Sequence, residues 1–150
     1  MGKKKVGEQT EGEALAEANK IEETLSKASD KQVSKKAHRG RAYIKSTYNN
    51  TTVTITDEKG NVLFWSTSGS LGFNGPKKAT PFAASKIVSV LYEKMKKAGM
   101  NELNVIVSGI GGGRDSAIRS LAGHGVNIIS IRDVTPIPHN GPKAKKVRRV

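Results

Sequence analysis

The sequence predicts a single three-layer α/β domain with a mixed sheet and an extended basic tail at the C-terminus. Three observations support this fold class: a run of short strands joined by turn residues, a helix with clear boundary residues, and a strand–helix–strand unit late in the chain. The early strands pair through short turns and are antiparallel, whereas the late unit requires parallel pairing. The expected order is therefore β-β-β-α-β-α-β.

Three strands open the domain. Threonine alternates with Val53 and Ile55, which gives the two-residue period of a half-buried strand. Turn residues flank this strand at 49–50 and 57–60. The expected strands cover residues 41–47, 51–56 and 61–67, and they form an antiparallel meander.

A helix follows a glycine-rich segment at 68–79. Thr80 is a favourable N-cap, Pro81 suits the first helical position, and Gly99 ends the helix. The predicted buried stripe recurs at three- and four-residue spacing and consists of Ala84, Ile87, Val88, Leu91 and Met95.

The remaining elements complete the parallel part of the sheet. Residues 103–107 are a nearly continuous apolar run, which predicts a strand covered on both faces. After a glycine cluster, Ile118 and Leu121 indicate a short second helix that closes at Gly123. Residues 126–132 are the predicted last strand.

The net charge of +13 is divided unevenly along the chain. Residues 1–38 carry eight lysines and seven acidic residues, whereas residues 39–150 carry 18 lysines and arginines and six acidic residues. This excess suits a polyanionic partner, because each cation that neutralises a phosphate releases a condensed counterion. A soluble basic protein without such a partner is the alternative. We expect an N-terminal extension at 1–38, the α/β domain at 39–135 and an extended tail at 136–150.

The N-terminal extension has no aromatic residue and few large apolar ones, so it cannot bury enough surface to offset its ordering entropy. A narrow apolar stripe nevertheless recurs at helical spacing and consists of Ala14, Ala18, Ile21, Leu25 and Ala28. Two interpretations stay open: a mostly solvated tail, and one amphipathic helix that docks on a partner.

The C-terminal tail is extended and cationic. Three prolines, Pro136, Pro138 and Pro142, disfavour a helix. Residues 143–150 contain no acid and five cations, which are Lys143, Lys145, Lys146, Arg148 and Arg149. Such a block repels itself until a polyanion neutralises it, and it can reach between phosphates that a globular surface cannot touch. A solvated tail that only aids solubility is the alternative.

Several function classes lack the residues they need. The chain has no cysteine, which excludes disulfides, thiolate zinc sites and cysteine nucleophiles. The six carboxylates of residues 39–150 form no recognisable catalytic set, and His38, His124 and His139 lack metal-ligand spacing. We therefore expect no enzyme, metal, cofactor or small-molecule substrate. With neither a membrane-spanning run nor a secretory signal, a cytoplasmic protein is the default.

The glycine cluster at 108–115 lies between a strand and a helix start. Exposed backbone N–H groups and a helix N-terminus make a phosphate a natural ligand there, and Arg114 would reinforce it. The cluster matches neither nucleotide-binding fingerprint, because the required lysine and third glycine are missing. A simple tight turn is the alternative.

His139, Asn140 and Gly141 end a rigid, proline-rich segment in a turn. Glycine does not shield the preceding asparagine, so Asn140 is a candidate for conversion to isoaspartate. An unmodified turn is the alternative.

Several motifs occur together in one order along residues 39–150. They are Tyr48-Asn49-Asn50-Thr51, Trp65-Ser66-Thr67-Ser68-Gly69-Ser70-Leu71-Gly72-Phe73, Thr80-Pro81-Phe82-Ala83-Ala84, residues 111–119, and Arg132-Asp133-Val134-Thr135-Pro136-Ile137-Pro138-His139-Asn140-Gly141. In these motifs the chain closely resembles the bacterial type of the eleventh small-subunit ribosomal protein family, almost end to end over 39–150.

The resemblance implies a ribonuclease-H-like fold without catalytic carboxylates, bound to small-subunit rRNA on the platform of the ribosome. It also implies a place at the mRNA exit, where the Shine–Dalgarno cleft forms, beside small-subunit proteins seven and eighteen. Matching positions give RNA contacts at Asn49, Asn50, Lys77, Lys78, Gly112, Gly113, Arg114, His139, Asn140 and the five tail cations. The expected RNA-binding residues also include Arg39, Arg41, Arg119 and Arg132.

Two features depart from the family pattern. The usual tail runs Gly-Cys-Arg-Pro-Pro-Lys-Lys-Arg-Arg-Val, whereas residues 141–150 keep the cation density but not the order. The extension at 1–38 is also longer than the family usually shows, and the resemblance gives it no role. Because the order of residues in the tail differs from the family pattern, individual tail contacts do not carry over residue by residue.

Overall fold

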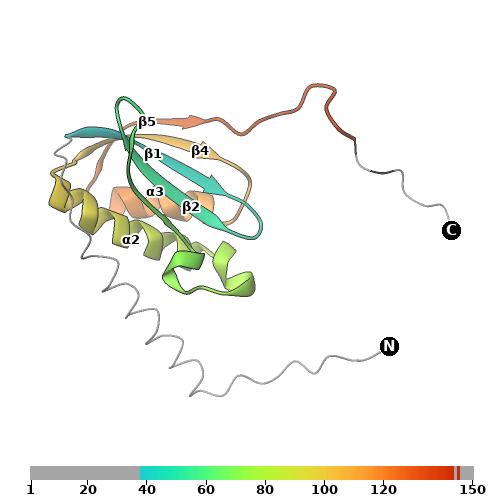
Figure 1. Cartoon of the computed structure of the whole chain (residues 1–150), viewed down its shortest axis with the longest axis horizontal. Helices are drawn as coiled ribbons and strands as arrows, with labels where there is room; N and C mark the ends of the chain where they lie inside the picture. Colours follow the sequence, from blue (N-terminus) through green and yellow to red (C-terminus); the bar gives the residue numbers. More distant parts are fainter. Residues whose placement is uncertain (1–37, 144, 146–150) are drawn as a thin grey trace, which may run out of the picture.

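The computed structural model describes residues 38–143 and 145, which form one domain on a five-stranded sheet (Figure 1). The strand order is β3-β2-β1-β4-β5. The strands are β1 (Arg39–Ser46), β2 (Thr51–Asp57), β3 (Val62–Thr67), β4 (Glu102–Ser108) and β5 (Asn127–Asp133). Pairing is antiparallel for β1–β2 and β2–β3 and parallel for β1–β4 and β4–β5, which confirms the α/β class, the mixed sheet and the predicted order.

The longer of the two described α-helices, α2 (Pro81–Ala98), begins and ends at the predicted residues. The Thr80 hydroxyl accepts a hydrogen bond from the Ala83 N–H at 3.2 Å, which satisfies one of the unpaired donors of the first turn. Pro81 occupies the first helical position, and Gly99 ends the helix at a φ of 74°. Two short 3-10 helices precede it, η1 (Gly69–Leu71) and η2 (Gly75–Ala79).

The two described α-helices, α2 and α3 (Gly113–Gly123), lie on the same face of the sheet (Figure 1). Parallel crossovers are almost always right-handed, and both crossovers here move along the sheet in the same direction, so both helices reach the same side. The prediction that 103–107 is covered on both faces is therefore wrong. Leu103, Val105 and Val107 are fully buried, whereas Asn104 and Ile106 are only half-buried.

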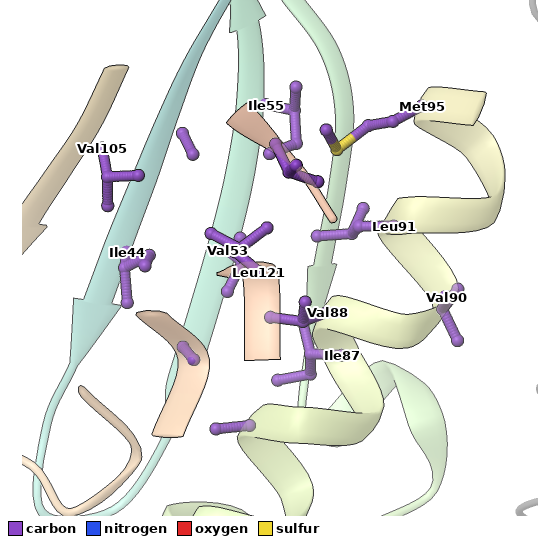
Figure 2. Packing of buried hydrophobic residues seen from close by; sticks show 14 of the residues in the cluster. Ile44, Val53, Ile55, Ile87, Val88, Val90, Leu91, Met95, Val105 and Leu121 are labelled. Carbon is purple, nitrogen blue, oxygen red and sulfur yellow. The ribbon is translucent and has the colours of Figure 1, made fainter. Parts of the chain in front are cut away.

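The core fills the space between this face of the sheet and the two helices (Figure 2). Strand residues such as Ile44, Val53 and Ile55 meet Leu91 of α2 and Leu121 of α3, and all five side chains are buried. Close packing of this kind makes single truncations costly, at about 2–5 kcal/mol for a leucine to alanine change. Among the described residues, the opposite face of the sheet carries no helix.

Some expectations fall outside the described residues. The proposed helical stripe at 14–28 lies in 1–37, and Lys146, Arg148 and Arg149 lie in the last five residues of the chain. Both interpretations of the N-terminal extension therefore stay open.

Candidate nucleic-acid interface

The segments that follow four of the strands meet at one end of the sheet. Strands β1, β3, β4 and β5 run in the same direction, so the residues after each of them emerge at the same end of the sheet (Figure 1). We call this end the loop end, and it consists of residues 47–50, 68–80, 109–112 and 134–135. Helices α2 and α3 both begin here, so two sets of unpaired N–H groups with partial positive charge lie at the loop end.

The β1–β2 turn presents Tyr48 and Asn49 to solvent. Thr47 closes the turn, because its N–H and hydroxyl both donate to the Asn50 carbonyl, at 2.9 and 3.1 Å. The Tyr48 side chain is 75% exposed, and Asn49 is also exposed. The side-chain carbonyl oxygen of Asn50 is buried without a hydrogen-bond partner among the described residues. Buried acceptors of this kind are rare in folded proteins and normally find a donor.

The glycine cluster packs tightly against this turn. The Gly111 N–H donates to the Ser46 carbonyl at 3.1 Å. A Cβ on Gly109 or Gly111 would overlap the backbone oxygens of Ser46 and Thr47, and one on Gly113 would overlap the Thr51 hydroxyl. Gly109 and Gly111 are therefore required for the close approach of two backbone segments, and Gly113 for the packing of α3 against the Thr51 and Ala84 side chains.

Gly112 differs from its neighbours. It is exposed, and the nearest atom to a Cβ added there is the Ala79 carbonyl oxygen at 3.7 Å, an ordinary contact. Gly112 also occupies the N-cap position of α3, without a side-chain cap. The cluster thus contains both a packed turn and one open position at a helix N-terminus.

Arg114 fastens the start of the tail to the glycine cluster. Its guanidinium donates to the Asp133 carboxylate at 2.6 Å and to the Gly109 carbonyl at 3.0 Å. The Thr135 hydroxyl donates to Asp133 at 2.6 Å and accepts a hydrogen bond from the Gly109 N–H at 3.1 Å. We call these four residues the tail clasp. Asp133 therefore pairs with Arg114, and not with its sequence neighbour Arg132.

The tail clasp lowers the pKa of the Asp133 carboxyl group. Hydrogen bonds from the Arg114 guanidinium, and then from the hydroxyl and N–H of Thr135, hold the pKa of Asp133 far below its ordinary value. All three donors stabilise the charged form, so Asp133 is ionised throughout the physiological range.

Lys77 and Lys78 lie in η2, beside the start of α2. Their backbone is fixed by two hydroxyls, because Thr80 donates to the Lys77 carbonyl at 2.8 Å and Ser68 donates to the Lys78 carbonyl at 2.6 Å. The Lys77 side chain is exposed, and Lys78 is half-buried. Two cations therefore lie at the loop end on a firmly held backbone.

The described part of the tail leaves the domain from the loop end (Figure 1). His139, Asn140, Lys143 and Lys145 are all exposed. Asn140 has a φ of 52°, in the left-handed region that asparagine tolerates better than most residues.

The remaining candidate arginines are not at the loop end. Arg39 lies at the opposite end of β1, where its guanidinium donates to Glu102 at 2.7 Å. Arg119 is exposed on α3. Arg41 and Arg132 lie on the helix-free face of the sheet, since their strand partners Asn104 and Ile106 alternate with buried residues of β4.

Comparison with known proteins decides the family. The model of the family described as Ribosomal protein S11 matches residues 40–149. The chain is 50% identical over 116 residues to the small ribosomal subunit protein uS11 of Treponema pallidum (strain Nichols), covering 77% of this chain and 92% of that protein. It is 50% identical over 124 residues to uS11 of Helicobacter pylori (strain G27), covering 82% and 95%. For uS11 of Nautilia profundicola the identity is 46% over 121 residues, covering 80% and 93%.

The chain belongs to the ribosomal protein S11 family. This confirms the resemblance in the sequence motifs, and it makes the chain a small-subunit ribosomal protein rather than an enzyme. Among the described residues, no three His, Asp or Glu side chains come together as metal ligands. The same part of the chain contains no helix with the length and apolar character of a membrane span.

Two features of this S11-family chain were not predicted from the sequence. The tail clasp joins Arg114 to a carboxylate 19 residues away, and no local pattern indicates such a pair. The helix-free face carries Tyr43, Lys45 and Trp65 besides its two arginines. The alternation in the strands did contain a signal for this face, because the positions between the buried residues are aromatic or cationic rather than uniformly small and polar.

Proposed function

We propose that this S11-family chain binds small-subunit rRNA through the loop end and the basic tail. The observation that carries the proposal is the convergence at one edge of two helix N-termini, Lys77, Lys78 and the base of a cationic tail. Phosphates are favoured at such a place by backbone N–H donors and by cations. The shape of the folded RNA, rather than base identity, supplies specificity.

The contacts divide into loop-end and tail contributions. Asn49 and Gly112, which are exposed, bring the protein backbone close to RNA, whereas Gly113 and the side-chain oxygen of Asn50 are buried and support this surface from within. Arg114 contributes mainly by aiming the tail, because its guanidinium is already engaged by Asp133 and Gly109. His139, Asn140 and the five tail cations then follow the RNA strands away from the domain.

The test is the salt dependence of binding to small-subunit rRNA. If about six cations engage phosphates, log affinity falls with log salt at a slope near −4, using the single-strand coefficient. Deletion of 143–150 should flatten this slope. Lys59→Gln, at the opposite end of the sheet, should change the slope by less than the amount expected for one lost phosphate contact. An unchanged slope after the deletion would count against the tail.

We also propose the finer placement: the platform of the small subunit, beside proteins seven and eighteen and next to mRNA at the exit, where the Shine–Dalgarno cleft forms. Family membership supports this placement, and so does the loop end, where two helix N-termini and two lysines lie at one end of the sheet. The chain lacks cysteine, so Asn49→Cys and Lys59→Cys each give one attachment point for a radical-generating probe. In assembled subunits, the probe at 49 should cleave platform rRNA and the probe at 59 should cleave it much less. Equal cleavage from both sites would argue against this orientation.

A histone-like compactor of DNA is the competing binding function for a chain of this charge. The two differ in competition, because the proposed contacts follow the shape of folded RNA. Duplex DNA in equal phosphate concentration should displace the protein from rRNA only weakly. Displacement as effective as that by unlabelled rRNA would favour the compactor.

Asn140 is proposed as a site of isoaspartate formation. Its side chain is exposed, the next residue is Gly141, and its φ of 52° places it in a turn rather than in regular structure. After ageing, the wild-type protein should accept more methyl groups from a protein isoaspartyl methyltransferase than Asn140→Gln, in which Asn74-Gly75 is the Asn-Gly pair that remains. Equal methyl acceptance by both proteins would rule out this residue.

A further inference from the structure

The helix-free face of the sheet has its own composition. We call it the open face, and its side chains include those of Arg41, Tyr43 and Lys45 from β1, Thr52 and Thr54 from β2, Trp65 and Thr67 from β3, Glu102, Asn104 and Ile106 from β4, and Ser130 and Arg132 from β5. The alternate residues of β1 and β4, such as Ala42 and Val105, are buried against the helices. No described helix covers this face.

One row of side chains crosses the whole open face. Direct cross-strand partners place Trp65 beside Thr54, Thr54 beside Tyr43, Tyr43 beside Ile106, and Ile106 beside Arg132. Neighbouring strands lie about 4.8 Å apart, so the row offers two aromatic rings, an apolar floor and a guanidinium in one line. Trp65 is 60% exposed, although large aromatic side chains are usually buried.

A groove of about 320 Å³ lies at the cationic end of this row. Arg41, Asn104, Ile106, Ser130 and Arg132 line it, and none of them is acidic. The Ser130 hydroxyl donates to the Asn104 carbonyl oxygen at 2.9 Å, so the Asn104 amide nitrogen is the donor that this side chain can turn towards a ligand. The groove therefore presents donors from two guanidinium groups and one amide.

The charge on the open face is one-sided. Arg41, Lys45 and Arg132 contribute three cations, and the acidic residue that the described strands place there, Glu102, is hydrogen-bonded to Arg39 at the far end. Two arginines that line one groove without a carboxylate repel each other, and an anionic ligand relieves that repulsion.

We propose that the open face binds an unpaired RNA strand, with Arg41 and Arg132 holding phosphates in the groove and Tyr43 and Trp65 stacking on bases. Cations combined with aromatic rings on an open sheet are the chemistry that single-stranded nucleic acid uses. An acidic peptide would satisfy the arginines but would leave both rings without a planar partner. The proposal extends the proposed rRNA binding to a second surface, which is separate from the loop end.

The test uses the single tryptophan of the full-length chain. Trp65 lies on the open face, so its fluorescence reports binding there and not at the tail. The probe is a short oligouridylate, which does not fold. We expect it to quench Trp65, and we expect Arg41→Gln with Arg132→Gln to weaken the quenching curve about tenfold or more, the size of two lost charge-assisted contacts.

The matched control removes two cations elsewhere. Lys59→Gln with Lys96→Gln lowers the net charge equally, but these exposed residues lie in the β2–β3 turn and in the last turn of α2. This variant should weaken the curve only slightly. Ultraviolet crosslinking gives a second readout, since the oligonucleotide should attach to peptides that contain Tyr43 or Trp65. Thermal melting of each variant establishes that it is folded.

Three results would overturn the proposal: no quenching by oligouridylate, equal weakening by both double variants, or stronger quenching by oligoglutamate, which would indicate a protein partner. Binding of intact small-subunit rRNA is measured on the same samples. If rRNA binds normally while the oligonucleotide fails to quench, the open-face proposal alone is wrong. If rRNA also fails to bind, the proposed function is wrong as well.

Discussion

At the scale of single residues, the tail clasp links proton binding to stability. The hydrogen bonds that depress the pKa of Asp133 stabilise the folded state only while this carboxyl is ionised. Their contribution is therefore complete above the ordinary pKa of 3.8 and is lost as the pH falls below it. In thermal melts, the wild type should be more stable than Asp133→Asn by a constant margin above about pH 5, and the margin should shrink in stronger acid.

Glu93→Gln is the matched control for this prediction, because it removes a carboxylate from the exposed side of α2, away from the tail clasp. The clasp assignment would be contradicted if Asp133→Asn and Glu93→Gln gave the same margin, or if the Asp133 margin did not depend on pH in acid.

Gly111 and Gly112, which are neighbours between β4 and α3, should respond in opposite ways to substitution by alanine. A methyl group on Gly111 would overlap the Thr47 carbonyl and the Ser46 hydroxyl, so Gly111→Ala should lower the free energy of unfolding by about 1–3 kcal/mol. Gly112 has room for a methyl group, so Gly112→Ala should be neutral or slightly stabilising. Denaturant titration of both variants measures the difference.

Binding of rRNA by Gly112→Ala distinguishes the two interpretations of the glycine cluster, a phosphate contact and a simple tight turn. If Gly112 approaches an RNA phosphate, Gly112→Ala should weaken rRNA binding even though the domain is as stable as the wild type. If the cluster is only a tight turn, Gly112→Ala should bind rRNA normally.

At the scale of elements, Thr80 connects α2 to the cationic segment before it. Its hydroxyl accepts from the Ala83 N–H and donates to the Lys77 carbonyl, so it caps the helix and fixes η2 at once. Thr80→Ala should cost about 1 kcal/mol, whereas Thr80→Ser keeps the hydroxyl and should cost much less. Chemical denaturation gives the cost, and a loss in Thr80→Ser as large as in Thr80→Ala would show that the methyl group, not the cap, matters.

The elements also show which features a sequence can predict. The β1–β3 meander and α2 were predicted closely, because alternation, turn residues and caps act over a few neighbouring positions. Coverage of β4 was predicted wrongly, because it depends on where two helices cross the sheet, and residues 103–107 carry no information about that. Of the site residues, 49–50, 77–78 and 112–114 meet at the loop end, but Arg39 lies at the other end, held by Glu102. Sequence proximity could not separate these groups, since strand direction determines which loops meet.

At the scale of the whole molecule, the described domain and tail carry most of a net charge of +13. Uncompensated charge destabilises a compact state through self-repulsion, and salt screens that repulsion. Salt also competes with counterion release when RNA binds. Salt should therefore have opposite effects on the two properties: between about 50 and 200 mM KCl, the melting temperature of the free protein should rise while its affinity for rRNA falls. Melting and binding measured on one preparation make the comparison. A melting temperature that fell with salt would contradict this prediction. It would mean that attractive pairs such as Arg114 with Asp133 outweigh the repulsion among the cations of the free protein.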